Sequence, residues 1–192
     1  SPYTLHRNPF SFSGSSEKPA ELRFTIKELG DFSSSIGKLK GGETVYIDGP
    51  YGNFSLDDAK TKTGLVLLAG GIGIAPVFSI LKSLEDRKDQ RPVYLFYGNY
   101  DEESIIFYSE IERMKKTLNL KVIHVLEKPQ GKITCESGFI TRALLEQSLP
   151  AEKSGLHFFQ CGPLPMIKAI KSYLHQMGIH TGQIHSEEYE MA

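Results

Sequence analysis

The feature that most constrains the fold is the alternation of continuously apolar segments with segments of helical periodicity after residue 63. Residues 64–69 form an uninterrupted apolar run, which is typical of a strand buried on both faces. The apolar residues behind it recur at the spacing of one helix face: Val77, Phe78, Leu81 and Leu84. Strands and helices that alternate in this way form a parallel sheet with helices on both faces.

The same alternation continues to the end of the chain. Further strands are expected at residues 92–97, 121–126, 157–161 and 183–187. Further helices are expected at residues 105–118, 141–147 and 163–177, the first of them with Ser104 as its N-cap. We therefore predict an α/β fold whose domain at residues 63–192 is a five-stranded, parallel, doubly wound sheet.

Residues 1–56 follow a different pattern. Residues 22–26 alternate apolar and polar side chains, and residues 44–47 do so more loosely, as half-buried strands do. Gly41-Gly42 and Gly49-Pro50-Tyr51-Gly52 punctuate them as turns. We expect a partial antiparallel β-barrel over residues 1–56, followed by a polar linker around residues 55–63.

Composition excludes several classes of protein. The 192 residues carry a net charge of −1, so no basic field favours nucleic acid. Cys135 and Cys161 lie far apart and the six histidines are scattered, so we predict neither a metal site nor a disulfide framework. No apolar run reaches the length of a membrane-spanning helix, and a reducing, cytoplasmic compartment fits best.

The glycine-rich turn after the first apolar strand is the strongest candidate binding site. Gly70, Gly71 and Gly73 allow positive φ angles and close approach to a phosphate, and a helix start adds N–H donors. Pro76 suits the first helical turn, although it stands near where the usual dinucleotide motif has a third glycine. The alternative interpretation is a tight strand-to-helix connection that binds nothing.

Two later segments end at the same edge of the expected sheet. Cys161-Gly162-Pro163 closes the strand at residues 157–161, and Tyr97-Gly98 closes the strand at residues 92–97. Ligands of open α/β sheets bind beyond the carboxyl ends of the strands, so both segments are candidate cofactor contacts. A lone cysteine is, alternatively, a small buried hydrophobe.

Two N-terminal segments offer aromatic and hydroxyl side chains together. Residues 8–13 place Phe10 and Ser11 in an alternating strand, as a flat aromatic cofactor would require, although from these residues alone a core strand of a barrel is the better explanation. Gly30 and Ser33 open a short helical segment that either holds a phosphate or is merely a capped turn.

Motifs along nearly the whole chain, taken in order, resemble those of the ferredoxin–NADP reductase superfamily. They are residues 8–13 (Asn-Pro-Phe-Ser-Phe-Ser), 22–27 with 30–33, 49–52 (Gly-Pro-Tyr-Gly), 70–76, 161–163 with Met166, and 184–189 with its Glu-x-aromatic ending. Within that superfamily the chain looks most like the cytoplasmic dehydrogenase modules of ferric reductases and NADPH oxidases.

The resemblance implies a function and a set of site residues. It implies a module that passes a hydride from NAD(P)H to FAD and then passes electrons to haem, iron or another acceptor. The implied catalytic residues are Ser11, near flavin N5, and Cys161 and Glu187, at the nicotinamide–flavin contact. The implied FAD contacts are Pro9, Phe10, Ile26, Lys27, Gly30 and Ser33. The implied dinucleotide contacts are Gly70, Gly71, Gly73, Pro76, Tyr97, Gly98, Gly162 and Pro163, with Tyr189 as the C-terminal aromatic.

Three departures from the superfamily's pattern bear on these expectations. Asn8 stands where members have Arg or His, and Ala75 replaces a common Thr. Members also carry further strands before the Pro-Phe-Ser strand, whereas seven residues precede Asn8. The expected barrel is therefore partial, which fits the cytoplasmic domain of an integral membrane protein or a fragment of a longer chain.

Other functions remain open on the sequence. One is a soluble flavin or ferredoxin reductase of the same superfamily. Another is a regulatory module that binds a nucleotide without turnover, and a third is an interaction domain on a doubly wound scaffold. The choice between NADP and NAD is also open, because the ends of the second and third strands carry both signs of charge, with Asp101 and Glu127 beside Lys128.

Overall fold

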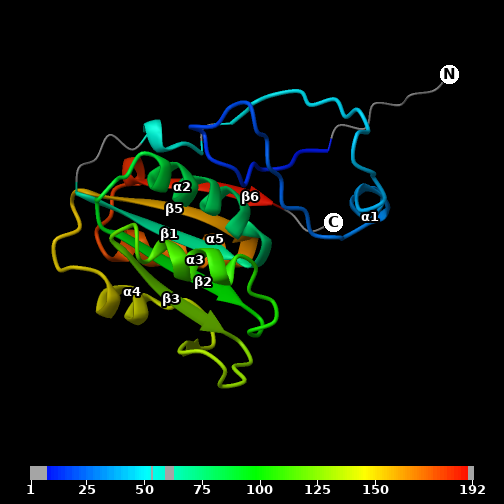
Figure 1. Ribbon diagram of the computed structural model, residues 1–192. Helices are drawn as coiled ribbons and strands as arrows, with labels where there is room; N and C mark the ends of the chain where they lie inside the picture. The colour runs from blue at the N-terminus through cyan, green and yellow to red at the C-terminus, as the bar shows by residue number, and fades with distance from the viewer. Residues whose placement is uncertain (1–7, 53, 59–62, 190–192) are drawn as a thin grey trace.

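The computed structural model describes residues 8–52, 54–58 and 63–189. Residues 64–189 form a sheet of six parallel strands in the order β4-β3-β2-β1-β5-β6 (Figure 1). The strands are β1 (Gly64–Gly70), β2 (Val93–Asn99), β3 (Leu120–Leu126), β4 (Glu136–Ser137), β5 (Leu156–Pro163) and β6 (Ile184–Tyr189). The helices are α1 (Asp31–Ile36), α2 (Ile74–Asp86), α3 (Tyr108–Met114), α4 (Arg142–Ser148) and α5 (Leu164–Gln176).

The chain winds outward from the centre of the sheet in both directions. It runs from β1 through β2 and β3 to the short β4, and then crosses to β5 on the other side of β1. The crevice between the carboxyl ends of β1 and β5 is therefore the topological switch point, which is where ligands of such sheets bind. The predicted doubly wound α/β fold is confirmed.

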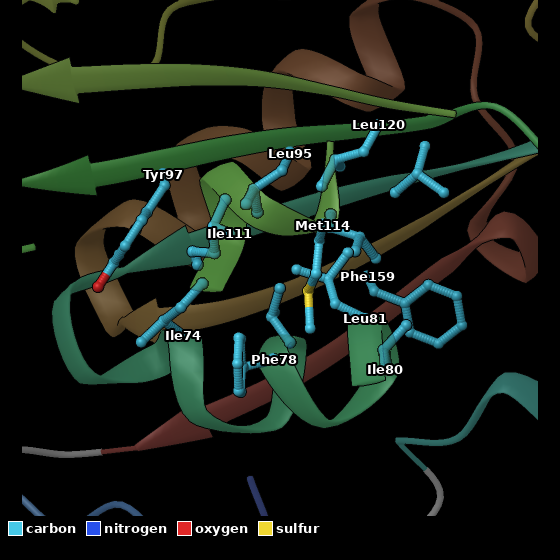
Figure 2. Packing of buried hydrophobic residues seen from close by; sticks show 14 of the residues in the cluster. Ile74, Phe78, Ile80, Leu81, Leu95, Tyr97, Ile111, Met114, Leu120 and Phe159 are labelled. Atoms are coloured by element: carbon cyan, nitrogen blue, oxygen red, sulfur yellow. The ribbon is translucent and has the colours of Figure 1, made fainter. Parts of the chain in front are cut away.

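Two buried clusters hold the helices to the two faces of the sheet. On one face α2 and α3 pack against β1, β2 and β5; on the other α4 and α5 pack against the opposite side chains. Figure 2 shows side chains of α2 (Phe78), α3 (Ile111 and Met114) and β2 (Leu95) in the first cluster. Every residue of β1 is buried, as expected of a central strand covered on both faces.

Two details of the sheet domain differ from the expectations. The sheet has six strands instead of five, because the two-residue β4 adds to the edge beside β3 and is too short to show periodicity. Helix α3 begins at Tyr108 rather than residue 105, after Phe107 adopts a left-handed φ of 61°. Ser104 is not its N-cap: its hydroxyl and N–H both donate to the Asp101 carboxylate.

The strands expected at residues 22–26 and 44–47 do not form. In the described part of residues 8–52 the strand-type pairing is one isolated antiparallel bridge between Phe12 and Phe24. Val45 and Tyr46 are exposed, with Tyr46 93% accessible, so their apolar side chains meet no second layer. In Figure 1 this blue segment loops out beyond the sheet, with α1 at its outer end. The alternating pattern alone did not create strands, because no described neighbouring strand completes the ladder.

Short single turns of 3₁₀ helix complete the fold. They are η1 (Leu56–Asp58) in the expected linker, η2 (Gly71–Gly73) after β1, and η3 (Thr181–Gln183) before β6. Among the described residues, no helix combines the length and the apolar character that a membrane crossing requires.

Candidate functional site

A cavity of about 810 Å³ opens at the carboxyl ends of the central strands. Its walls come from the turn after β1, the ends of β2, β3 and β5, the first turns of α5, and the N-terminal segment. The lining includes Gly71, Gly98, Asn99 and Phe139 from the sheet domain, and Ile26 and Lys27 from the N-terminal segment. The volume lies within the range of small-molecule and cofactor sites.

The glycines of the first turn have two different roles. Gly71 has a φ of 52° and faces open space, so its lack of a side chain leaves the cavity floor accessible and its backbone unstrained. A Cβ on Gly73 would instead collide with the Cys161 carbonyl of β5, and one on Gly70 would lie 2.6 Å from the Met166 sulfur. Gly71 therefore shapes the cavity, whereas Gly70 and Gly73 allow the turn to pack against β5 and α5.

Three predicted catalytic residues meet where β5 and β6 end. Cys161 and Glu187 are paired in the ladder, and the Ser11 hydroxyl donates to Glu187 Oε1 at 3.3 Å. Burial, with a smaller effect of the Glu187 carboxylate, raises the pKa of the Cys161 thiol to about 12. Burial also raises the pKa of Glu187, although the Ser11 hydrogen bond opposes that shift. Cys161 is thus a neutral thiol at neutral pH, and no thiolate chemistry is available from it.

The remaining predicted residues of the sheet domain fall into two groups. Gly98 and Pro163 line the cavity, whereas Pro76 is buried in the third position of α2. Tyr97 is fully buried in the core cluster drawn in Figure 2, and it is not among the residues that line the cavity. The backbone of Tyr189 pairs with Pro163 at the end of β6, and its side chain lies outside the described part of the chain.

The predicted flavin contacts are only partly brought together. Ile26 and Lys27 line the cavity, but Gly30 and Ser33 lie at α1, where the Ser33 hydroxyl is engaged by the backbone of Leu29 and Gly30. Pro9 is exposed. The ring of Phe10 lies parallel to that of Phe32, with centroids 6.0 Å apart.

Two residues outside the set of predicted cofactor contacts belong to the same cavity. Asn99, at the end of β2, is 7% exposed, and neither atom of its amide has a hydrogen-bond partner among the described residues. Phe139 is 71% exposed at the cavity rim, directly after Gly138, whose φ is 99°. Asn99 could have been found from its place at a strand end, whereas Phe139 follows a two-residue strand that has no sequence signal.

These features fit a nicotinamide dinucleotide. An unpartnered, buried amide is costly unless a ligand or water satisfies it, and Asn99 offers both a donor and an acceptor to a ribose or a phosphate. The exposed Phe139 ring offers a face for a base. In the described part of the chain no three His, Cys, Asp or Glu side chains gather where they could hold a metal ion.

Comparison with known proteins defines the class to which this fold and cavity belong. The family described as oxidoreductase NAD-binding domain matches residues 67–172, more than half of the chain, and the chain belongs to that family. Relatives include NADH-cytochrome b5 reductase 1 of Dictyostelium discoideum, 29% identical over 85% of this chain and 58% of the relative. The same-named protein of Lodderomyces elongisporus is 34% identical over 82% of this chain and 53% of the relative.

Solved structures agree with this assignment. The CS-b5R domains of human Ncb5or, in their NAD+ form, are 30% identical and superpose with a TM-score of 0.78 over 97% of this chain and 57% of that one. A ferredoxin NADP+ reductase from Neisseria gonorrhoeae with bound FAD and NADP is 25% identical, with a TM-score of 0.75 over 93% of this chain and 78% of that one. The expected membership of the ferredoxin–NADP reductase superfamily is confirmed, whereas the narrower likeness to ferric reductases and NADPH oxidases stays a prediction. The chain spans a little more than half the length of the named reductases.

Proposed function

We propose that this chain is the nucleotide-binding part of an NADH-dependent flavin oxidoreductase that delivers electrons to a haem protein. The observation that carries the proposal is one cavity lined both by Gly70 and Gly71 of the turn after β1 and by Ile26 and Lys27 of the N-terminal segment. A dinucleotide held at the first pair and a flavin held at the second would share one cavity, as contact between their reacting rings and a direct hydride transfer require.

Each wall of the cavity has a task in binding the dinucleotide. The turn at Gly71 would receive the pyrophosphate, because its backbone approaches the cavity without side chains. Asn99 would hydrogen-bond the adjoining ribose, and the apolar wall that contains Phe139 and Tyr173 would take the adenine. Gly98, near the end of β2, and Gly162 and Pro163, at the end of β5, would contact the same dinucleotide, because these strand ends lie at one edge of the sheet.

The proposed roles at the reacting end rest on the contact between Ser11 and Glu187. A bound flavin supplies the hydride-accepting ring nitrogen and the ability to release electrons singly. Ser11 donates its proton to Glu187, which would hold the hydroxyl in place with an oxygen lone pair free to accept a hydrogen bond from the ring N–H of the reduced flavin. Cys161, as a buried neutral thiol, would keep the contact between the two rings free of charge and water.

The charges at the ends of β2 and β3 favour NADH over NADPH. Glu127 lines the cavity, and its carboxylate would repel a 2′-phosphate while accepting a hydrogen bond from a free ribose hydroxyl. The ammonium of Lys128 lies 4.8 Å from the centroid of the Tyr100 ring, and the Asp101 carboxylate is bonded to Ser104. Glu127→Gln should therefore raise the use of NADPH about tenfold or more relative to NADH, whereas Lys128→Gln should not.

The proposal also includes an electron acceptor and a cellular location. The names of the relatives support a cytochrome b5-type haem protein as acceptor, and an iron chelate is the acceptor expected of a ferric reductase. We propose a cytoplasmic location, either free or as the cytoplasmic domain of an integral membrane protein. Reduction of cytochrome b5 and of a ferric chelate by the same preparation would separate the two acceptors.

The direct test is anaerobic reduction of added FAD by NADH, followed through the loss of the visible flavin band. The proposal predicts that the chain accelerates this reduction and that Ser11→Ala slows it by about tenfold or more. A chain that binds NADH without any turnover would instead be a regulatory module. A chain that binds no dinucleotide would be an interaction domain, and the proposal would be wrong.

A further inference from the structure

Helix α2 contacts both sides of the proposed hydride-transfer site. Its first residue, Ile74, follows directly on the Gly71–Gly73 turn that borders the cavity. Its second half faces residues 14–18 of the N-terminal segment. The helix side chains on this face are polar rather than apolar. That polar stripe consists of Ser79, Ser83, Asp86 and Arg87.

Two serines of this polar stripe hold the backbone of the N-terminal segment. The Ser79 hydroxyl donates to the Gly14 carbonyl at 2.5 Å, and the Ser16 N–H donates to Ser83 Oγ at 2.9 Å. Ser83 is 2% exposed and also donates to the Ser79 carbonyl, so its hydroxyl is fixed in both roles. Bonds to the main chain determine the position of the segment, whereas bonds between mobile side chains would not.

Ion pairs extend the contact at the end of the helix. Arg87 lies 2.7 Å from the Glu17 carboxylate, and Lys18 lies 3.1 Å from Asp86. These pairs are partly exposed, and pairs of that kind add little to stability. The two serine bonds are therefore the defining part of the contact.

The segment that the serines hold leads to both flavin-side residues. Ser13 is fully buried: its N–H donates to the Arg23 carbonyl at 2.8 Å, and its hydroxyl accepts from Thr25 at 2.8 Å. Ser11, two residues before Ser13, contacts Glu187, and Thr25 begins the residues that line the cavity. A shift at Gly14 would consequently move both the Ser11 hydroxyl and the wall formed by Thr25 to Lys27.

We propose that Ser79 and Ser83 are positioning residues that fix the flavin-side segment relative to the dinucleotide turn. The start of α2 follows the turn where the dinucleotide would bind, and its second half holds the segment that would contact the flavin. The helix therefore fixes the distance between the two. The expected effect on electron transfer rests on the function proposed above, whereas the position of the N-terminal segment does not. Neither serine touches the cavity, so their effect would be through geometry.

The test compares Ser79→Ala, Ser83→Ala and the double variant with Ser172→Ala, an exposed serine on α5. Hydrogen exchange of the chain without added cofactor reports the position of the segment directly. We expect the amides of Ser13 and Ser16 to exchange at least about tenfold faster in the double variant, while amides of β1 do not change. The single variant Ser79→Thr, which keeps the hydroxyl, should retain slow exchange at Ser13 and Ser16, and Ser172→Ala should match the unmodified chain.

Kinetics with FAD and NADH then test the consequence for electron transfer. The proposal predicts that the double variant has a lower kcat and an unchanged KM for NADH, because the dinucleotide turn is intact. Unchanged exchange at Ser13 and Ser16, or faster exchange with an unchanged kcat, would overturn it. If the unmodified chain itself does not oxidise NADH, the proposed function fails, and the positioning of the segment is decided by the exchange rates alone.

Discussion

The sheet domain and the N-terminal segment contain similar kinds of residues but differ in what covers them. In residues 64–189 the apolar strands are enclosed by α2 and α3 on one face and by α4 and α5 on the other. In residues 8–52 apolar side chains such as Val45 and Tyr46 face outward. An apolar residue stabilises a fold only when a second layer removes it from water. The sheet domain therefore encloses its own apolar clusters, whereas the N-terminal segment leaves these apolar side chains exposed and is held to the sheet domain by contacts such as those of Ser79 and Ser83.

The largest expected contrast comes from deleting one aromatic ring in each region. Phe158 of β5 is fully buried in the second cluster, and Phe158→Ala should lower the free energy of unfolding by about 3–5 kcal/mol. Tyr46 is 93% exposed, so Tyr46→Ala should change it by less than about 0.5 kcal/mol. Urea unfolding of both variants measures the difference. Comparable losses would show that the segment has a core of its own.

A pair of glycines gives the next largest contrast. Gly73→Ala forces a Cβ against the Cys161 carbonyl, so we expect a loss of about 3 kcal/mol together with weaker NADH binding. Gly30→Ala meets nothing within 4 Å and has an extended backbone, so stability should hardly change. Thermal unfolding and an NADH titration of the two variants provide the measurement. An unaffected Gly73→Ala would contradict the close packing of the turn on β5.

A smaller and pH-dependent effect is expected where α2 meets the end of α3. Arg113 donates two hydrogen bonds to Glu85, at 2.6 and 3.0 Å, and this contact above all lowers the pKa of Glu85 to about 2. The resulting stability is complete above the unfolded pKa near 4.5 and is lost as the pH falls toward 2. We expect this contact to contribute about 2 kcal/mol to the free energy of unfolding. That is less than the full pKa shift of Glu85 implies, because Arg113 is half exposed and solvent screens the interaction.

The matched variant for this effect is Glu85→Gln, which keeps the size of the side chain. Glu85→Gln should be less stable than the unmodified chain at neutral pH, and the difference should shrink as the pH falls from about 4.5 toward 2. Denaturation at neutral and at acidic pH measures the gap. A gap that does not shrink in acid would show that the carboxylate's charge is not responsible.

The sheet domain was predictable because its signals are long and redundant. The buried run at residues 64–69 and the helical spacing from Val77 to Leu84 each identify an element without reference to the other, and the structure contains both as β1 and α2. The short β4 and the late start of α3 were not predictable, since two residues show no period and the left-handed Phe107 depends on tertiary packing. The strands expected at residues 22–26 and 44–47 do not form, although their sequence alternates. An alternating pattern is not sufficient for a strand, because a neighbouring strand must also be present to pair with it.

The site was predictable where it follows from topology. Gly71, Gly98 and Pro163 lie at strand ends that meet in one cavity, as the doubly wound fold requires. Tyr97 was placed at the same edge, but a strand alternates its side chains, and this one points into the core. Sequence spacing does not reveal contacts between residues far apart in the chain. It therefore predicts neither the place of Phe139 in the cavity nor the hydrogen bonds of Ser79 and Ser83 to the N-terminal segment.

Hydrogen exchange with and without NADH tests the central claim most directly, namely that one cavity joins the dinucleotide turn to the N-terminal segment. The account predicts slower exchange on adding NADH at Gly71 and Gly98, around Phe139, and at Ile26 and Lys27 across the cavity. Tyr46 and the amides of α4, which do not line the cavity, should be unaffected. Protection confined to other surfaces, or none in the turn after β1, would contradict it.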